Sequence, residues 1–336
     1  MSGGVDSSVS AHLLKEAGYE VEGIHLLLSP GSREAAEKTA AELESACRML
    51  DIPLHFLNLE KEFSARVIGP FCREYENGRT PNPCVQCNRI VKFGMLLEKV
   101  KALGGAYLAT GHYARVENSG GVFQLKKGLD AGKDQSYFLH MLGQKELASV
   151  LFPVGGLLKS QVKKMAADLG LPAAQKRESQ DICFIPDNDS RAFLAARLTA
   201  RPGEIVDTTG KVLGQHQGLA FYTIGQRQGM GIAASQPLYV LKMETVANRL
   251  VVGFKDQLYR DHLTAGGVNW VAGQPPENGL AITARVRYRA QEARAILQIE
   301  GDTVKVRFSE PQWAIAPGQS VVFYQGDTVL GGGSIE

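Results

Sequence analysis

A short loop of glycine and serine at the start of the chain limits the folds open to it, because the loop leads directly into a predicted helix. The run Ser2-Gly3-Gly4-Val5-Asp6-Ser7-Ser8 comes just before a helical stripe of Val9, Leu13 and Ala17. Two adjacent glycines let the backbone turn tightly, and small hydroxyl side chains leave room for a ligand. The following helix N-terminus presents unpaired N–H groups and the positive end of the helix dipole. The loop therefore suits a pyrophosphate group, with Asp6 as a candidate ligand of Mg²⁺.

A simpler interpretation of this loop is a Gly-Ser turn in which Ser7 or Asp6 caps the helix. The seven residues together, however, match the SGGxDS loop of the N-type ATP pyrophosphatases, which cleave ATP to AMP and pyrophosphate. A Walker loop is excluded, because the segment 128–134 has the wrong spacing and ends in Asp134. A phosphate loop of this kind should follow a strand, and only Met1 precedes it here. We therefore expect the first strand to be missing and stability to be reduced without it.

The first half of the chain alternates helical and strand patterns. Apolar runs of strand length are followed or preceded by stripes at helical spacing. Strands separated by helices indicate an α/β fold with a parallel sheet. The predicted strands are 21–28, 54–57 and 106–110, and the predicted helices are 9–17, 36–50 and 90–100.

The pattern changes near residue 201 into short alternating segments separated by turns, which predicts a β-barrel or sandwich. The segments are 238–243, 250–254, 282–288 and 304–308, and the stretch before the change carries predicted helices around 162–169 and 189–198. We expect a catalytic domain at 1–142 whose end extends to about 200. We further expect a helical continuation of this domain at 143–200, a small central β-rich domain at 201–262 and a C-terminal β-barrel at 263–336.

The composition is that of an ordinary globular protein. The 37 basic and 35 acidic residues leave a formal net charge of +2, which neither favours nor excludes nucleic acid as a partner. No apolar run approaches the roughly 20 residues of a membrane-spanning helix, so we expect no membrane protein. The N-terminus lacks the basic stretch and apolar core of a signal peptide. Five cysteines, an odd number in a long chain, predict a reducing, cytoplasmic setting. We also expect a monomer.

Two of the cysteines differ from the rest in their surroundings. Cys47 lies on a helical apolar stripe and Cys72 lies in an apolar stretch, so buried packing is the better interpretation for both. Cys183, taken alone, has the pattern of a cysteine in the core of a strand. Its pairing with a Cys-x-x-Cys segment 96 residues upstream (183 − 87) in a nucleotide-binding chain favours a redox or sulfur-relay role.

The Cys-x-x-Cys segment is Cys84-Val85-Gln86-Cys87, and two prolines at 81 and 83 give it a rigid approach. We expect its thiols just before a helix, with Arg79 and Arg89 close in sequence. A helix N-terminus and nearby cations stabilise a thiolate, so a lowered pKa and nucleophilic chemistry are predicted. The alternative is half of a zinc site, which would need two further ligands, and the chain has no second Cys-x-x-Cys.

Several blocks in the same order resemble the tRNA 2-thiouridylase family of N-type ATP pyrophosphatases over essentially the whole chain. Beside the phosphate loop, these blocks are Gly78-Arg79-Thr80-Pro81-Asn82-Pro83 through Cys87-Asn88, Ala109-Thr110-Gly111-His112-Tyr113, Lys133-Asp134-Gln135-Ser136-Tyr137, Glu178-Ser179 through Ile182-Cys183-Phe184-Ile185, and Tyr222-Thr223-Ile224-Gly225-Gln226-Arg227. The resemblance implies an N-terminal parallel-sheet domain of the adenine nucleotide alpha hydrolase-like type, a small central domain and a C-terminal β-barrel.

The resemblance also implies a reaction, the 2-thiolation of uridine 34 in the tRNAs for Lys, Glu and Gln. ATP adenylates the C2 oxygen, a persulfide attacks C2, AMP leaves and a second thiol resolves the sulfur bond. Matched by position, Cys183 would carry the persulfide, supplied by a sulfur-relay protein, and Cys87 would form a transient disulfide with it. The implied ATP contacts are Ser2, Gly3, Gly4, Val5, Asp6, Ser7, Ser8, Leu26 and Gly111. The implied tRNA contacts are Asn82, Pro83, Cys84, His112, Lys133, Asp134, Gln135, Arg287, Tyr288 and Gln319.

Three alternatives stay open at this point. Cys84 stands where the family often has Asp, and with Cys87 and Cys183 it gives three thiolates that could hold a [4Fe–4S] cluster with one open iron. Such a cluster would deliver bound sulfide without a protein persulfide. The second alternative is an ATP pyrophosphatase that forms amides or amidines with an amine nucleophile. The third is a non-catalytic RNA-binding module that retains the nucleotide loop.

Local positive charge is the remaining signal for RNA. The run Arg285-Val286-Arg287-Tyr288-Arg289 predicts a strand with its three arginines on one face. Arginine contacts phosphate or stacks on bases, and tyrosine also stacks. The simpler alternative is a solvated strand face. Further basic residues are Lys126-Lys127, Lys133, Lys163-Lys164 and Lys176-Arg177.

Overall fold

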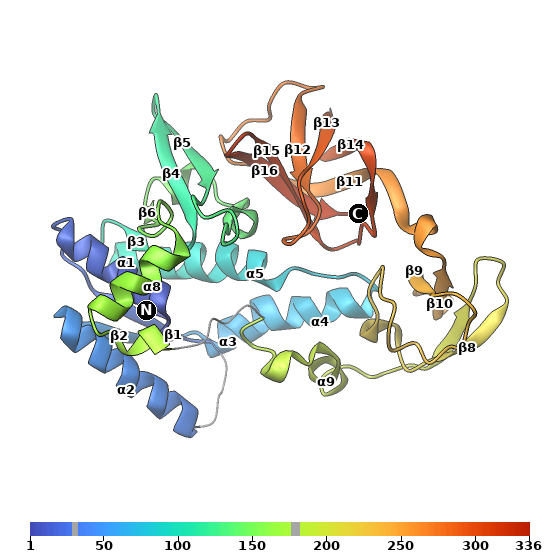
Figure 1. Cartoon of the computed structure of the whole chain (residues 1–336), viewed down its shortest axis with the longest axis horizontal. Helices are drawn as coiled ribbons and strands as arrows, with labels where there is room; N and C mark the ends of the chain where they lie inside the picture. The colour runs from blue at the N-terminus through green and yellow to red at the C-terminus, as the bar shows by residue number, and fades with distance from the viewer. Residues whose placement is uncertain (29–32, 176–181) are drawn as a thin grey trace.

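The structure, a computed structural model, describes residues 1–28, 33–175 and 182–336, and within these ranges the side chains of 33–36 and 175 are set aside. Figure 1 shows helices and short strands on the side of the N-terminus, a small sheet at the far end, and a barrel that contains the C-terminus. Lys176-Arg177 and the Glu178-Ser179 part of its block lie outside the described residues. The predicted fold class, α/β followed by two β domains, is confirmed.

The N-terminal part is built from helices around two short pairs of strands. Its helices are α1 (Val5–Glu16), α2 (Arg33–Leu50), α3 (Glu60–Phe63), α4 (Gly69–Glu76), α5 (Pro83–Gln86), α6 (Leu97–Ala102), α7 (Gln144–Leu147), α8 (Lys159–Asp168) and α9 (Ser190–Ala195). Two π-helices, η1 (Ser64–Ile68) and η2 (Cys87–Leu96), and the 3₁₀ turns η3 (Ser136–Leu139), η4 (Pro172–Gln175) and η5 (Pro186–Asn188) complete it.

In the described residues of the N-terminal part, the parallel strands form two separate pairs. β1 (Gly23–Leu27) pairs with β2 (Leu54–Asn58), and β3 (Leu108–Ala109) pairs with β6 (Val150–Leu151). Met1 lies along β1, where its amino group donates to Ile24 and its carbonyl accepts from Nδ1 of His25 at 2.8 Å. The expectation of a further strand ahead of the phosphate loop stays a prediction.

Two apolar cores place the functional segments. In the first, Val5 and Val9 of α1 pack with Val162 of α8. This packing fixes α1 and, with it, the phosphate loop at its N-terminus. In the second, aromatic residues of α3, α4 and α9 pack with Cys87 and Val91 of η2. Buried Cys47 and Cys72 belong to these two cores, and their predicted packing roles are confirmed.

The central domain is a small sheet in the order β8-β7-β10-β9. Its strands are β7 (Gly203–Val206), β8 (Val212–His216), β9 (Tyr239–Glu244) and β10 (Arg249–Gly253), with the turns η6 (Leu219–Phe221) and η7 (Lys255–Leu258) beside it. Only β7 and β10 run parallel among these pairs. Ile205, Val240, Leu250 and Val252 are fully buried and form its core.

The C-terminal domain is a barrel, because β11 pairs both with β14 and with β16 and so closes the sheet. Its strands are β11 (Tyr259–Trp270), β12 (Ala281–Arg285), β13 (Ala293–Glu300), β14 (Thr303–Trp313), β15 (Ser320–Gln325) and β16 (Thr328–Ile335). Alternate residues such as Leu297, Val306 and Phe323 fill the interior, as the period of two requires.

A hairpin from the first half extends this barrel, which the sequence did not predict. β4 (Ala114–Ser119) and β5 (Val122–Lys127) are antiparallel, and Leu125 of β5 pairs with Val329 of β16. Figure 1 shows the hairpin standing beside the barrel. Within residues 1–28, 33–175 and 182–336, no helix has both the length and the apolar character that crossing a bilayer requires.

Candidate nucleotide and thiol site

The phosphate loop closes on itself through its serines. The Ser2 and Ser7 hydroxyls are 3.1 Å apart, and the Ser7 hydroxyl donates to the Gly4 carbonyl at 3.1 Å. Gly3 has a φ of +76°, a conformation that favours glycine. Gly4 is the N-cap of α1, and no side chain caps the helix there. The simpler interpretation, a cap by Ser7 or Asp6, is therefore wrong, and the first-turn N–H groups of α1 are left for a ligand.

Gly111 lies directly against this loop. A Cβ on Gly111 would come within 2.7 Å of the Asp6 carbonyl carbon and 2.9 Å of the Ser7 nitrogen, so no larger residue fits without a shift. Gly111 therefore lies beside the phosphate loop, and its contact with the nucleotide stays a prediction. Leu26 is partly buried on β1 and packs against two apolar clusters, one of them the core that holds Cys87.

Asp6 is held by two residues that the sequence analysis missed. Lys159, at the start of α8 and almost fully buried, donates to Oδ1 of Asp6 at 2.6 Å. The Tyr113 hydroxyl donates to the same oxygen at 2.8 Å, and the Lys159 ammonium lies 5.5 Å from the Tyr113 ring centre. Lys159 could not be found from spacing, because its partner lies 153 residues away.

The donor chemistry of Asp6 fits Mg²⁺, since hard cations take carboxylate oxygens. The Tyr113 and Lys159 hydrogen bonds given above both fall on Oδ1. A magnesium ion bound with ATP would neutralise phosphate charge next to α1. The loop and Asp6 are the part of the described chain that would hold this pair.

The thiol segment follows a rigid turn. Asn82 caps α5, its Oδ1 accepting from the Val85 N–H at 3.4 Å, and Pro83 is the first helical residue. α5 runs straight into the π-helix η2, so Cys84 is partly buried and Cys87 is buried inside a continuous helical segment.

Cys183 is brought to this segment by the residues that follow it. Phe184 and Ile185 are buried in the second core, and the Phe184 ring lies 5.6 Å from Phe63 and 5.4 Å from Phe71. Cys183 itself is exposed and not part of a strand, so the strand-core alternative is wrong. Cys87 lies in the same core as Phe184 and Ile185, so Cys183 comes near the thiol segment, and an ionised Cys183 raises the pKa of both Cys84 and Cys87.

The predicted lowering of the thiol pKa is also wrong. Burial raises the pKa of Cys84 to about 11, and Cys87 and Cys183 shift in the same direction for the same first reason. Cys87 lies within the helical segment rather than at its N-terminus, and Arg79 is paired with Glu74 at 2.8 Å. The positive charge that acts on all three thiols is that of Lys92.

A [4Fe–4S] cluster would need the three thiols grouped around one site. No group of three or more His, Cys, Asp or Glu side chains in the described part of the chain is arranged to hold a metal ion. The three thiols in this arrangement therefore do not fit a [4Fe–4S] cluster.

Hydrogen bonds join the barrel to the turn that precedes Cys84. The Thr80 N–H donates to the Pro317 carbonyl at 2.7 Å, and Nε2 of Gln319 donates to the Thr80 carbonyl at 2.9 Å. Arg79 donates to the Ile335 carbonyl at 3.1 Å. Gln319, predicted as a tRNA contact, is thus one of the residues that fix the thiol segment to the C-terminal domain.

Other predicted tRNA contacts lie inside the fold. The Asp134 carboxylate is buried, accepts from the Ser136 N–H at 3.1 Å and lies 3.4 Å from Arg285. Oε1 of Gln135 accepts from the Tyr113 N–H at 3.0 Å. Asp134 and Gln135 thus make contacts within the fold, and their predicted contacts with tRNA stay predictions.

The arginine run does not form the predicted strand face. β12 ends at Arg285, and residues 286–290 form a turn. The Arg287 guanidinium donates to the carbonyls of Trp313 and Ala314. The ring centres of Tyr288 and Phe138 are 4.4 Å apart, and the Arg289 side chain is exposed. The alternating pattern of residues 285–289 predicted a strand wrongly, because β12 ends at Arg285 and the Val286 side chain is buried in the barrel core.

Much of the predicted basic charge near the hairpin is compensated. Lys126 pairs with Glu117 at 2.9 Å, and Lys127 pairs with Glu292 at 2.7 Å. Lys133 is half-buried.

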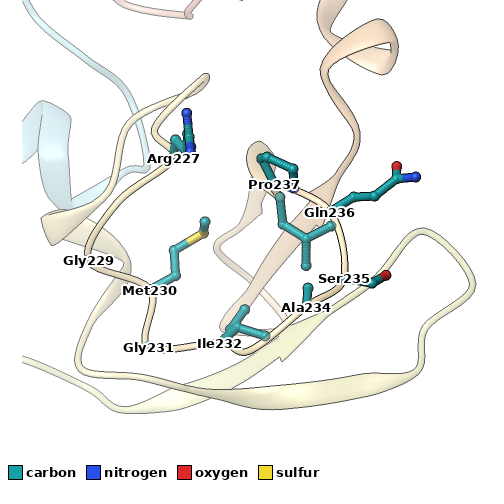
Figure 2. Close-up of a pocket in the computed structure, with 10 residues that line it drawn as sticks. Arg227, Gly229, Met230, Gly231, Ile232, Ala234, Ser235, Gln236 and Pro237 are labelled. Carbon is teal, nitrogen blue, oxygen red and sulfur yellow. The ribbon is translucent and has the colours of Figure 1, made fainter.

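A separate pocket of about 390 Å³ lies in the central domain. Figure 2 shows the loop from Arg227 to Pro237 curling around it, with Met230 and Ile232 beside the hollow and Gln236 pointing away. This loop includes the end of the Tyr222–Arg227 block. In Figure 1 the central domain lies at the opposite end of the molecule from α1, so this pocket is apart from the phosphate loop.

Three family models match the chain. Residues 1–187 match one described as a tRNA methyl transferase HUP domain, and residues 191–254 match a tRNA methyl transferase PRC-barrel domain. Residues 260–335 match an aminomethyltransferase beta-barrel domain.

Curated relatives match over the full chain. The chain is 47% identical over 352 residues to a tRNA-specific 2-thiouridylase MnmA of Geotalea uraniireducens, covering 100% of this chain and 93% of the relative. It is 47% identical over 349 residues to the protein of that name from Moorella thermoacetica, covering 100% and 98%. It is 46% identical over 342 residues to that of Dehalococcoides mccartyi, covering 100% and 95%.

Proposed function

We propose, from the premise that this chain belongs to the tRNA-specific 2-thiouridylase family, that it uses ATP to replace the C2 oxygen of a tRNA uridine by sulfur. We take wobble uridine 34 of the tRNAs for Lys, Glu and Gln as its target. The observation that carries the proposal is that Cys87 packs in one core with Phe184, the residue after Cys183, in the domain whose first residues form the phosphate loop.

Activation of the uridine is assigned to the N-terminal loop. The uridine C2 oxygen attacks the α-phosphorus of ATP, the bond to the β-phosphate breaks and pyrophosphate leaves. The N–H groups at the start of α1 and the glycine loop would receive the pyrophosphate, because such helix ends bind anions. Lys159 supplies a fixed positive charge at Asp6 in this loop.

Sulfur transfer is assigned to two thiols of different exposure. Exposed Cys183 can receive a persulfide sulfur from a donor protein, whereas buried Cys87 is suited to act only inside the site. The terminal persulfide sulfur attacks C2 and AMP leaves. The Cys87 thiolate then attacks Sγ of Cys183, which forms the Cys87–Cys183 disulfide and releases 2-thiouridine.

The test is nucleoside analysis by mass spectrometry of tRNA incubated with ATP, a persulfide donor and the protein. We expect 2-thiouridine at position 34 with the wild type, none with Cys183→Ser, and unchanged yield with Cys72→Ser, a buried thiol of the second core. Thiolation that persists in Cys183→Ser contradicts the persulfide route. ATP consumption with an amine product and no sulfur supports the ligase alternative, and tRNA binding without pyrophosphate release supports the binding module.

A further inference from the structure

Lys92 lies in a stretch of π-helix that places it beside the thiols. It comes five residues after Cys87 within η2. In an α-helix, with 3.6 residues per turn, residues five apart point to different faces. In a π-helix the hydrogen bonds join residues five apart, which stacks their positions on one face. The unusual helix type therefore turns Lys92 toward the side that carries Cys87.

A buried histidine fixes the Lys92 ammonium from the other side. Nζ of Lys92 lies 3.5 Å from Nε2 of His112, and Nδ1 of His112 lies 2.7 Å from the Thr110 hydroxyl. A lysine ammonium can only donate, so Nε2 is the acceptor and Nδ1 carries the hydrogen. Burial first, and then the Lys92 charge, hold the pKa of His112 well below its usual range, which keeps the ring neutral.

The charged groups around the three thiols leave Lys92 as their common cation. The Lys92 charge lowers the pKa of Cys84 in α5, of Cys87 in η2 and of exposed Cys183. An ionised Cys183 in turn raises the pKa of Cys84 and Cys87. His112, facing from the segment after β3, is neutral. One cation among three partly or fully desolvated thiols can support one sulfur anion at a time.

We propose that Lys92 is the positioning residue for sulfur transfer, holding the single sulfur anion of the site first on Cys183 and then on Cys87. This proposal rests on the proposed function and explains how mostly protonated thiols can react in turn. When the Cys183 persulfide has attacked and its charge has left with AMP, the ammonium is available to the Cys87 thiolate. His112 serves this step by keeping the Lys92 ammonium at the thiols.

The test measures alkylation of each cysteine by iodoacetamide between pH 7 and 9.5, resolved by peptide mass spectrometry without tRNA or ATP. We compare Lys92→Gln and Lys92→Arg with Lys99→Gln, an exposed lysine of the adjoining α6. Cys72, whose charged neighbours are Arg197, Glu76 and Arg73, is the internal control for unfolding. At pH 7.5 we expect Lys92→Gln to slow Cys183 alkylation about 5- to 10-fold, because loss of the Lys92 charge raises the pKa of the Cys183 thiol and leaves less thiolate.

Lys92→Arg should keep the Cys183 rate within about 2-fold of wild type, because it keeps the charge. An unchanged rate of Cys183 alkylation in Lys92→Gln overturns the proposal. An equally slow Cys183 reaction in Lys92→Arg also overturns it, as does faster Cys72 alkylation in Lys92→Gln, which would show that unfolding causes the change. The alkylation assay uses no tRNA, so it is independent of the thiolation assay. If the chain fails to thiolate tRNA but Lys92→Gln still slows Cys183 alkylation, the proposed function is wrong and the effect of the Lys92 charge on Cys183 stands.

Discussion

Lys159 donates a hydrogen bond at 2.6 Å to Oδ1 of Asp6 and so joins the start of α8 to the start of α1. The lysine side chain is 9% exposed and the aspartate 32%, so water screens this pair less than a surface pair. The contact places a cation and an anion inside the loop that we assign to ATP. Its removal should affect both the fold and nucleotide binding.

We predict that Lys159→Met lowers the free energy of unfolding by about 1–3 kcal/mol, because it leaves a partly buried carboxylate without its cation. ATP affinity should fall about tenfold, which corresponds to roughly 1.4 kcal/mol. Chemical denaturation and calorimetric titration measure the two effects. The control is Lys164→Met, whose pair with Asp168 on the same helix is exposed and should cost under about 0.5 kcal/mol. Equal losses in both variants would count against a special role for Lys159.

Gly318 lets the barrel reach the thiol segment, and its substitution should uncouple the two. Its φ is +89°, and a Cβ would come within 3.0 Å of the Thr80 nitrogen. We predict that Gly318→Ala costs about 1–3 kcal/mol of stability and reduces thiolation, because the turn before Cys84 must move.

The matched control for that change is Gly326→Ala. Gly326 also has a positive φ, +62°, but a Cβ there would meet open space. Its thiolation rate should equal that of the wild type, with only the backbone strain appearing in the denaturation curve. A similar loss of activity in the two variants would show that backbone strain, and not contact with Thr80, is responsible.

His140 should make stability depend on pH. It is buried against Gly332 of the barrel, its Nδ1 donates to the Tyr137 carbonyl at 2.8 Å, and burial lowers its pKa to about 4. The unfolded chain takes up this proton near pH 6.5 and the folded chain only near pH 4, so stability is full above 6.5 and declines between 6.5 and 4. We predict a loss of about 3 kcal/mol across that window.

Denaturation curves at pH 7 and pH 4.5 measure this dependence, and His140→Phe is the comparison. The variant should show a smaller decline over the same window because it has no proton to bind. An identical pH profile in the variant would assign the acid sensitivity to other groups.

The turn after β12 should contribute to tRNA binding through Arg289 more directly than through Arg287. Arg289 is exposed, whereas the Arg287 guanidinium is bonded to the end of β14 and lies 5.0 Å from the Trp313 ring centre. We predict that Arg289→Ala weakens tRNA binding and reduces the slope of log affinity against log salt by about 1. Arg287→Ala should lower the melting temperature as well as tRNA affinity. Filter binding across a salt series and a thermal melt separate the two, and an unchanged salt slope in Arg289→Ala would exclude its phosphate contact.

The sequence predicted the parts of the molecule that depend on local pattern. The helix after the phosphate loop, β1, β2 and the strands after residue 201 have clear periodicity, and each forms near its predicted place. The hairpin β4–β5 escaped prediction because its partner, β16, lies about 200 residues along the chain. No local signal records such a pairing.

The sequence predicted which cysteines form the site better than it predicted their chemistry. Spacing found Cys87 and Cys183 but gave the wrong direction for the thiol pKa, because it counted nearby arginines and not burial. Lys92 was missed because an assumed α-helix points it away from Cys87. Lys159 was missed because only the folded chain brings it to Asp6.

The most direct test of the account is a single turnover with protein loaded with one persulfide on Cys183 and no further sulfur donor. Wild type mixed with ATP and tRNA should yield up to one 2-thiouridine per protein and, under non-reducing mass spectrometry, an equal amount of Cys87–Cys183 disulfide. Cys87→Ser should stall as a tRNA joined to Cys183 through sulfur. Full yield of 2-thiouridine without that disulfide, or an unaltered yield from Cys87→Ser, would contradict the account.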